Sequence, residues 1–454
     1  MRNFSICGIL VAMLLFSACA ETSPSLDAAQ TADTDAISET LVETDTGMLA
    51  ETALDTEVET SAGLPMETNQ EPEKELATEL ATEPTTEPVT EPVTEPVTEL
   101  MTENEETTQT ETEAETEAVT DAETESETQP VKTFQNPLAT AYSAPDPYVI
   151  YHDGYYYATF TETLGVGLYR SRNIETLYTD EKITVTNLTD QIQGNVWAPE
   201  LHYYPPTDRW YIYACGTTNG WEFASMRMFC LESKTSDPFG EYEFKGYTDP
   251  NLLAIDQTVF YDEVTGTLYT SYSEFTSAGQ CIMLAVMENP WTISNEYTRV
   301  RVSVPQYSWE KRGADGVQDP RVNEGPIFLE HNGKLSLIYS ASGCWSEYYC
   351  LGLLEFVGDD FSVEQMLVKV NWKKRSEPIF SSANGVYGVG HCNFFTSPDG
   401  TETWISYHGM STPDAGVNGR YAYVQKITFD DKGLPVCGEP WSRDTLIPVP
   451  SGEA

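Results

Sequence analysis

The chain has 454 residues and a formal net charge of −48, because 72 acidic residues stand against 24 basic ones. Nucleic-acid binding requires clustered basic residues, so this balance argues against a nucleic-acid partner. The composition changes sharply along the chain and divides it into residues 1–19, 20–131 and 132–454.

Residues 1–19 are typical of a secretory signal. They carry one basic residue, Arg2, and an apolar core over residues 6–16. This core is shorter than the about 20 residues that a membrane-spanning helix needs. It ends in Phe16-Ser17-Ala18-Cys19, which resembles a bacterial lipobox and predicts lipid attachment at Cys19. The alternative is ordinary cleavage nearby, which would release the protein from the cell.

Residues 20–131 predict a disordered linker. They hold 32 of the 72 acidic residues and a single base, Lys74, and they contain no aromatic residue. A degenerate Thr-Glu-Pro-Val repeat begins at Thr86. Low hydrophobicity and repulsion between like charges keep such a segment unfolded and extended. We therefore expect a spacer that holds residues 132–454 away from a cell surface.

Residues 132–454 repeat one pattern five times. Each copy has a polar residue in a Pro- or Gly-rich turn, an apolar run, a hairpin turn and an aromatic strand. The polar residues are Asp146, Glu200, Asp256, Glu324 and His391, and the turns that follow are Asp153-Gly154, Thr207-Asp208, Thr265-Gly266, Asn332-Gly333 and Asp399-Gly400. Successive turns are 55 to 67 residues apart. A strand-bearing period of this length predicts an all-β, five-bladed β-propeller with one repeat per blade.

The remaining features fit this fold. A third strand is expected after each aromatic strand, and only residues 360–368 suggest a helical turn. The region holds seven cysteines, an odd number, and no Cys-x-x-Cys pair. We expect these cysteines to act mainly as small buried apolar residues rather than as zinc ligands.

Equivalent positions of propeller blades converge on the central channel, so the pattern gathers four carboxylates and one histidine. Paired carboxylates in an aromatic pocket suit the cleavage of glycosidic bonds, in which one carboxyl donates a proton and another acts on water or sugar. Burial and a neighbouring carboxylate would raise the pKa of the proton donor. The alternative is that these residues only cap strands. No Gly-x-Ser-x-Gly, phosphate loop or His-Glu-x-x-His is present, and His202, His331 and His408 are expected to be structural or exposed.

Five motifs, taken together and in this order, resemble those of glycoside hydrolase family 43. They are Ser143-Ala144-Pro145-Asp146-Pro147, Trp197-Ala198-Pro199-Glu200, Ile255-Asp256, Asn323-Glu324-Gly325-Pro326 and Gly390-His391. The resemblance implies a five-bladed propeller and an inverting mechanism.

The same resemblance implies roles for individual residues. Asp146 would be the general base, Glu324 the general acid, and Asp256 would tune the pKa of the acid. Trp197 and Glu200 would line the substrate pocket. No cofactor would be required, although His391 matches a histidine that approaches a water or a calcium ion in the channel.

Two further segments are similar to exo-acting α-L-arabinofuranosidases of this family. They are Met226-Arg227-Met228-Phe229 and Tyr339-Ser340-Ala341-Ser342. The similarity implies release of arabinofuranosyl units from plant cell-wall polysaccharide by a monomer, lipid-anchored on the outer face of a bacterial envelope or else secreted. An endo-arabinanase, a β-xylosidase and a non-catalytic carbohydrate-binding propeller are the alternatives.

Overall fold

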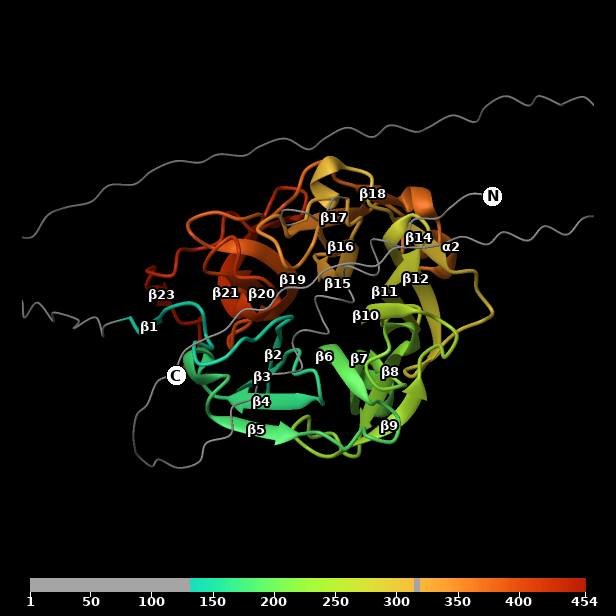
Figure 1. The fold of residues 1–454 in the computed structure, drawn as a ribbon, viewed down its shortest axis with the longest axis horizontal. Coiled ribbons are helices and arrows are strands. Elements are labelled where there is room, and N and C mark those ends of the chain that lie inside the picture. Colours follow the sequence, from blue (N-terminus) through green and yellow to red (C-terminus); the bar gives the residue numbers. More distant parts are fainter. Residues whose placement is uncertain (1–130, 314–318) are drawn as a thin grey trace, which may run out of the picture. The chain divides into compact units, whose positions relative to one another are not determined.

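The computed structural model describes residues 131–313 and 319–454, and this part of the chain is an all-β propeller of five sheets around a common centre (Figure 1). The five-bladed propeller prediction is therefore confirmed. The predicted signal segment, and the predicted linker up to residue 130, lie outside the described residues. Within the described ranges, no helix is both long and apolar enough to cross a membrane.

Each blade is an antiparallel sheet whose strands follow one another in sequence from the centre outwards, except that in blade 3 both β13 and β14 pair with β12. Blades 1 and 2 consist of β2 (Tyr148–His152), β3 (Tyr155–Thr159), β4 (Gly167–Ser171) and β5 (Glu181–Thr184), then β6 (Gly194–Tyr204), β7 (Arg209–Thr217), β8 (Met226–Ser233) and β9 (Tyr242–Tyr247). Blade 3 consists of β10 (Ala254–Asp262), β11 (Thr267–Thr276), β12 (Gly279–Asn289), β13 (Thr292–Ile293) and β14 (Val300–Ser303). Blades 4 and 5 consist of β15 (Asn323–His331), β16 (Lys334–Ala341), β17 (Cys350–Phe356) and β18 (Trp372–Lys374), then β19 (Tyr387–Thr396), β20 (Thr403–Met410), β21 (Arg420–Phe429) and β22 (Pro435–Val436).

Helical segments are short and lie between strands. The single α-helical turn among the described residues is α2 (Val363–Met366), inside the range that the sequence predicted. The 3-10 turns are η2 (Ile174–Thr176), η3 (Pro205–Thr207), η4 (Phe223–Ser225), η5 (Ser308–Glu310), η6 (Lys369–Asn371) and η7 (Val417–Gly419).

The first hairpin of each blade uses the turn residues that the sequence indicated. In blade 1, Asp153 and Gly154 have φ values of 46° and 81°, the left-handed conformations of a two-residue hairpin turn. Blades 2, 3 and 5 have only one left-handed turn residue each: Asp208, Gly266 and Gly400. In blade 2 the turn follows η3, which the two prolines at its start favour because their φ is fixed.

A bulge interrupts most inner strands close to the channel. Register shifts lie between Trp197 and Glu200 in β6, Ile255 and Thr258 in β10, Glu324 and Ile327 in β15, and Gly390 and His391–Asn393 in β19. Left-handed residues stand at these points and just before β2: Asp146, Ala198, Asp256, Gly325 and His391. Such a bulge turns its side chain away from the normal strand alternation.

The positions of the bulges show that one detail of the predicted repeat was wrong. Asp146, Asp256 and His391 occupy the left-handed position of their blades. Glu324 stands one residue before that position and Glu200 two residues after it. The five predicted polar residues are therefore not strictly equivalent.

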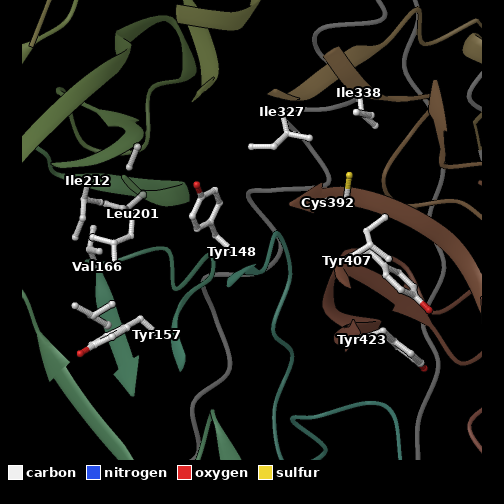
Figure 2. Packing of buried hydrophobic residues seen from close by; sticks show 14 of the residues in the cluster. Tyr148, Tyr157, Val166, Leu201, Ile212, Ile327, Ile338, Cys392, Tyr407 and Tyr423 are labelled. Atoms are coloured by element: carbon white, nitrogen blue, oxygen red, sulfur yellow. The ribbon is translucent and has the colours of Figure 1, made fainter. Parts of the chain in front are cut away.

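The apolar core lies between neighbouring blades. Tyr148, Leu201 and Ile327, from three inner strands, belong to one buried cluster (Figure 2). All seven described cysteines are free, and all but Cys344 are buried, as expected of small core residues.

The ends of the described domain close the ring. β1 (Thr133–Phe134) pairs with β23 (Ile447–Pro448), so the N-terminal strand is held by the C-terminal one. The Asn136 side chain adds two hydrogen bonds to the backbone of Val424 in blade 5. Blades 1 and 5 are thereby joined through residues from both ends of the domain.

This closure predicts a stability difference between two adjacent residues. Ile447→Ala should lower the free energy of unfolding by about 2–5 kcal/mol, because Ile447 is fully buried against the core of blades 1 and 5. Leu446→Ala is the matched control, since Leu446 is 66% exposed and should change stability by less than about 0.5 kcal/mol. Equal effects of the two substitutions on denaturant unfolding would contradict the closure.

Candidate active site

Asp146 lies buried at the centre of a network of polar contacts. Its Oδ1 is 2.9 Å from Nη1 of Arg420, 3.3 Å from Nδ1 of His391 and 3.2 Å from Nδ1 of His408. Its Oδ2 accepts a hydrogen bond of 2.7 Å from the Thr161 hydroxyl. Both oxygens of this carboxyl group therefore have partners that favour negative charge.

These partners decide the ionisation of Asp146. Burial by itself would raise the pKa of the carboxyl, but Arg420 and His391 hold this pKa well below its usual value. Asp146 is therefore a carboxylate at neutral pH, fixed in one orientation by the ion pair.

The pKa values of Asp256 and Glu324 are raised, in contrast to that of Asp146. Asp256 Oδ2 accepts a hydrogen bond of 3.0 Å from the backbone N–H of Gly325. Glu324 accepts hydrogen bonds of 2.8 Å from both Gln280 and Tyr349. Burial, only partly opposed by His391, raises the pKa of Asp256 to about 7 and also raises that of Glu324. The two carboxyls interact, so they titrate as a pair that retains a proton above the ordinary range.

Gly325 makes this close packing feasible. Its φ is +52°, and a Cβ at this position would lie 3.2–3.3 Å from the ring of His391. A larger residue would press on His391 and strain the left-handed backbone. The glycine therefore lets the strand that carries Glu324 approach the histidine of blade 5.

Glu200 and His391 complete the convergence of the five blades. Burial would lower the pKa of His391, but Asp146, Asp256, Glu324 and Glu200 together raise it above its usual value. Charges act strongly on a pKa only at short range, so all four carboxyls lie near the imidazole of His391. Glu200 is itself buried, with Oε2 at 2.7 Å from Nε2 of His202. The five polar residues that the sequence singled out are thus brought together.

Trp197 stands three residues before Glu200 on β6. It is partly buried, and its ring centroid lies 6.3 Å from that of Phe223 in the loop between β7 and β8. Its place beside the channel is compatible with the predicted lining of a substrate pocket.

The residues around His391 do not fit a calcium site. Calcium takes six to eight oxygen ligands. The Asp146 oxygens beside His391 are occupied by Arg420, Thr161 and the histidines. Among the described residues, no group of three or more His, Cys, Asp or Glu side chains is arranged so that it could hold a metal ion. No step below is assigned to a metal ion.

The sequence analysis missed several residues of this network. Arg420 and His408 contact Asp146, and Gln280 and Tyr349 contact Glu324. His202, which was expected to be structural or exposed, contacts Glu200. Arg420 had a usable signal, because it begins the third strand of blade 5 in a strongly acidic domain. Gln280 and Tyr349 had none, since their strands show no distinguishing pattern.

His408 is buried and remains neutral. The backbone N–H of Asp146 donates to its Nδ1, which places the ring proton on Nε2. Burial, reinforced by Arg420, lowers the pKa of His408 to about 4. Its ring stacks on Tyr349 at a centroid distance of 5.2 Å. The neutral ring therefore links the residues that hold Asp146 to those that hold Glu324.

A five-bladed propeller with interacting carboxyls in its channel is suited to acid–base cleavage of carbohydrates. Comparison with known families then identifies the family of this chain. The family model described as "Glycosyl hydrolases family 43" matches residues 134–435. The chain therefore belongs to glycosyl hydrolase family 43.

Curated relatives narrow the comparison. An extracellular exo-α-(1→5)-L-arabinofuranosidase of Streptomyces avermitilis is 34% identical over 70% of this chain and 66% of the relative. The protein of that description from Streptomyces chartreusis is 32% identical over 61% of this chain and 82% of the relative. An α-L-arabinofuranosidase 43 of Humicola insolens is 33% identical over 68% of this chain and 62% of the relative. The chain thus spans slightly less than two thirds of the first and last of these relatives.

A solved structure shows the same architecture. The α-L-arabinofuranosidase from Lactobacillus brevis superposes with a TM-score of 0.60 at 29% identity, covering 69% of this chain and 98% of that one.

The ion pair between Arg420 and Asp146 predicts a specific change in pH dependence. Arg420→Met removes the positive charge that lowers the pKa of Asp146, so this pKa should rise. If ionised Asp146 is required, the acidic limb of kcat/KM should move to higher pH by the same amount. Arg420→Lys keeps the charge and is the matched control. An unshifted acidic limb in Arg420→Met would show that Asp146 does not control it.

Proposed function

We propose that this chain is an inverting, exo-acting α-L-arabinofuranosidase that releases arabinofuranosyl units from arabinan or related plant cell-wall polysaccharide. The observation that carries the proposal is the difference in pKa among three interacting carboxyls of the channel. Asp146 is held ionised, whereas Asp256 and Glu324 have raised pKa values. Glycosidic hydrolysis requires this combination of a base and an acid. The names of the relatives support arabinofuranose as the sugar.

In this mechanism Asp146 accepts a proton from the attacking water. Its ion pair with Arg420 keeps it deprotonated, and the Thr161 hydroxyl helps to fix its orientation. Glu324 donates its proton to the leaving sugar oxygen. Burial raises the pKa of Glu324 and so favours the protonated form, while Gln280 and Tyr349 stabilise the carboxylate that forms when the proton leaves. Asp256 raises the pKa of Glu324 by repulsion when it is itself ionised.

Inversion is the stereochemistry that the resemblance to glycoside hydrolase family 43 implies. Asp146 raises the pKa of Glu324, so the two carboxyls lie close enough to interact. An inverting enzyme separates its two carboxyls by about 6.5–9.5 Å to admit water. Asp146 is also committed to Arg420, which suits a base better than a nucleophile.

Digestion of linear arabinan, followed by proton NMR, tests this function. We expect free arabinose from the start, with the anomer opposite to that of the substrate formed first. Oligosaccharides as the first products would instead indicate an endo-arabinanase. Activity confined to xylo-oligosaccharides would indicate a β-xylosidase, and binding without product would indicate a non-catalytic propeller.

Three variants assign the roles within the same assay. Glu324→Gln should slow arabinan hydrolysis by about 10²–10⁴-fold, because the proton donor is lost. It should retain activity on an aryl arabinofuranoside whose leaving group needs no proton. Asp146→Asn should be inactive on both substrates. If Asp256→Asn, rather than Glu324→Gln, is rescued by the good leaving group, Asp256 is the acid.

We further propose that the domain, residues 132–454, acts outside the cell and is tethered there by the linker of residues 20–131. A polysaccharide cannot enter a cell, and the extracellular Streptomyces relatives support this location. The sequence around Cys19 supports lipid attachment after removal of the signal segment, which places the protein on the outer face of a bacterial envelope. Secretion without a lipid is the alternative.

Replacing Cys19 tests the anchor. Cys19→Ala should move the protein from the detergent phase to the aqueous phase, because stable attachment requires the acyl chains of a lipoprotein. Hydrolytic activity should be unchanged. Cys7→Ala is the matched control, since Cys7 lies within the predicted signal and should leave partitioning unaffected. Wild-type protein found free in the medium would establish secretion.

A further inference from the structure

A second pocket lies between the inner strands of blades 2 and 3. It has a volume of about 270 Å³, and its lining includes Tyr203, Tyr204, Phe260, Tyr261 and Glu263. These residues lie at or just beyond the C-terminal ends of β6 and β10. Five residues separate Tyr261 from Asp256 along β10, roughly 15 Å of strand. The pocket therefore lies toward the opposite end of these strands from the catalytic carboxyls.

Tyrosine rings from both blades form its wall. The Tyr204 ring lies 5.1 Å from Tyr261 at 77°, and 6.1 Å from Tyr211 at 79°. Tyr203 is 42% exposed, although large aromatic residues are usually covered. Tyr203 also lines the pocket, but its ring packs on Trp210 at 5.1 Å and its hydroxyl donates to Asp208, so the aromatic faces inside the pocket are those of Tyr204 and Tyr261.

The hydroxyls of these tyrosines fall into two groups. Tyr211 donates to Glu232 and Tyr213 donates to the carbonyl of Pro290, so their hydroxyls are satisfied within the protein. The Tyr204 and Tyr261 hydroxyls form no hydrogen bond with any described residue, and both side chains are only partly buried. These two groups can therefore bond to a ligand that packs on the rings.

The chemistry of the lining selects the class of ligand. Among the residues that line the pocket there is neither lysine nor arginine, and Glu263 adds negative charge. Phosphate, sulfate and uronate groups are therefore disfavoured. A sugar ring combines an apolar C–H face with a hydroxyl edge, which matches aromatic faces beside free hydroxyls. The volume is just below the 300–1,000 Å³ of typical drug-sized sites, which suits one or two pentose units.

From this combination we propose that the pocket is a second, non-catalytic binding site for neutral pentose units of a polysaccharide chain. Tyr204 and Tyr261 pack on the sugar and bond to its hydroxyls, and Tyr203 extends the contact at the mouth. The site rests on the proposed function for its substrate. It would hold the polymer on the domain while a chain end is cleaved in the channel.

Affinity electrophoresis in gels containing linear arabinan tests the site, with the full chain carrying Glu324→Gln to prevent digestion. Adding Tyr261→Ala should weaken retention about fivefold, equivalent to about 1 kcal/mol. Tyr297→Ala is the matched control, because Tyr297 is 38% exposed and lies outside the pocket. With Glu324 intact, Tyr261→Ala should leave turnover of a small aryl arabinofuranoside unchanged. That turnover also reports correct folding, and Tyr203→Ala replaces it if Tyr261→Ala does not fold.

The outcomes separate this site from the proposed function. Arabinan hydrolysis with retention insensitive to both Tyr261→Ala and Tyr203→Ala would overturn the second site alone. Retention on xylan that depends on Tyr261 would support the site and overturn the arabinan specificity. Competition by choline, but not by arabino-oligosaccharides, would show that the rings bind a cation by cation–π interaction and would overturn the carbohydrate proposal.

Discussion

The buried ion pair between Arg420 and Asp146 is the interaction on which the channel depends. Taking a carboxylate out of water costs several kcal/mol unless a partner compensates. Arg420 supplies this compensation to Asp146, and no lysine or arginine forms an ion pair with Asp256 or Glu324 among the described residues. The pKa values of the carboxyls therefore differ within one site: that of Asp146 is held low by its ion pair, whereas burial raises those of Asp256 and Glu324.

Backbone geometry makes this arrangement possible. Each inner strand has a left-handed residue near the channel, and in three blades that residue is itself polar: Asp146, Asp256 and His391. Aspartate and histidine tolerate this conformation better than β-branched residues do. In blade 4 the position belongs to Gly325, which lets Glu324 reach the channel from the preceding residue while His391 packs closely. One repeated backbone irregularity thus presents different chemistry in each blade.

The two ends of the inner strands have different characters. Toward their beginnings, the strands of blades 2 and 3 carry Glu200 and Asp256, and at their ends they carry Tyr204 and Tyr261. His202 lies between these regions, bonded to Glu200 and also lining the tyrosine pocket. A propeller strand extends through the whole depth of its domain, so the same strand can present a charged site at one end and an aromatic surface at the other.

The sequence by itself determined the all-β propeller, its five blades and the set of polar residues at its centre. Hairpin turns such as Asp153-Gly154 and the alternating strands are encoded locally, and their period fixes the number of blades. The tertiary structure decided which side chains complete the site. Arg420 and Gln280 lie on different blades from Asp146 and Glu324, respectively, and meet them only when blades assemble, whereas Tyr349 reaches Glu324 when blade 4 folds. It also decided the ionisation of each carboxyl, because burial and neighbouring charge arise from packing between blades and cannot be read from local sequence.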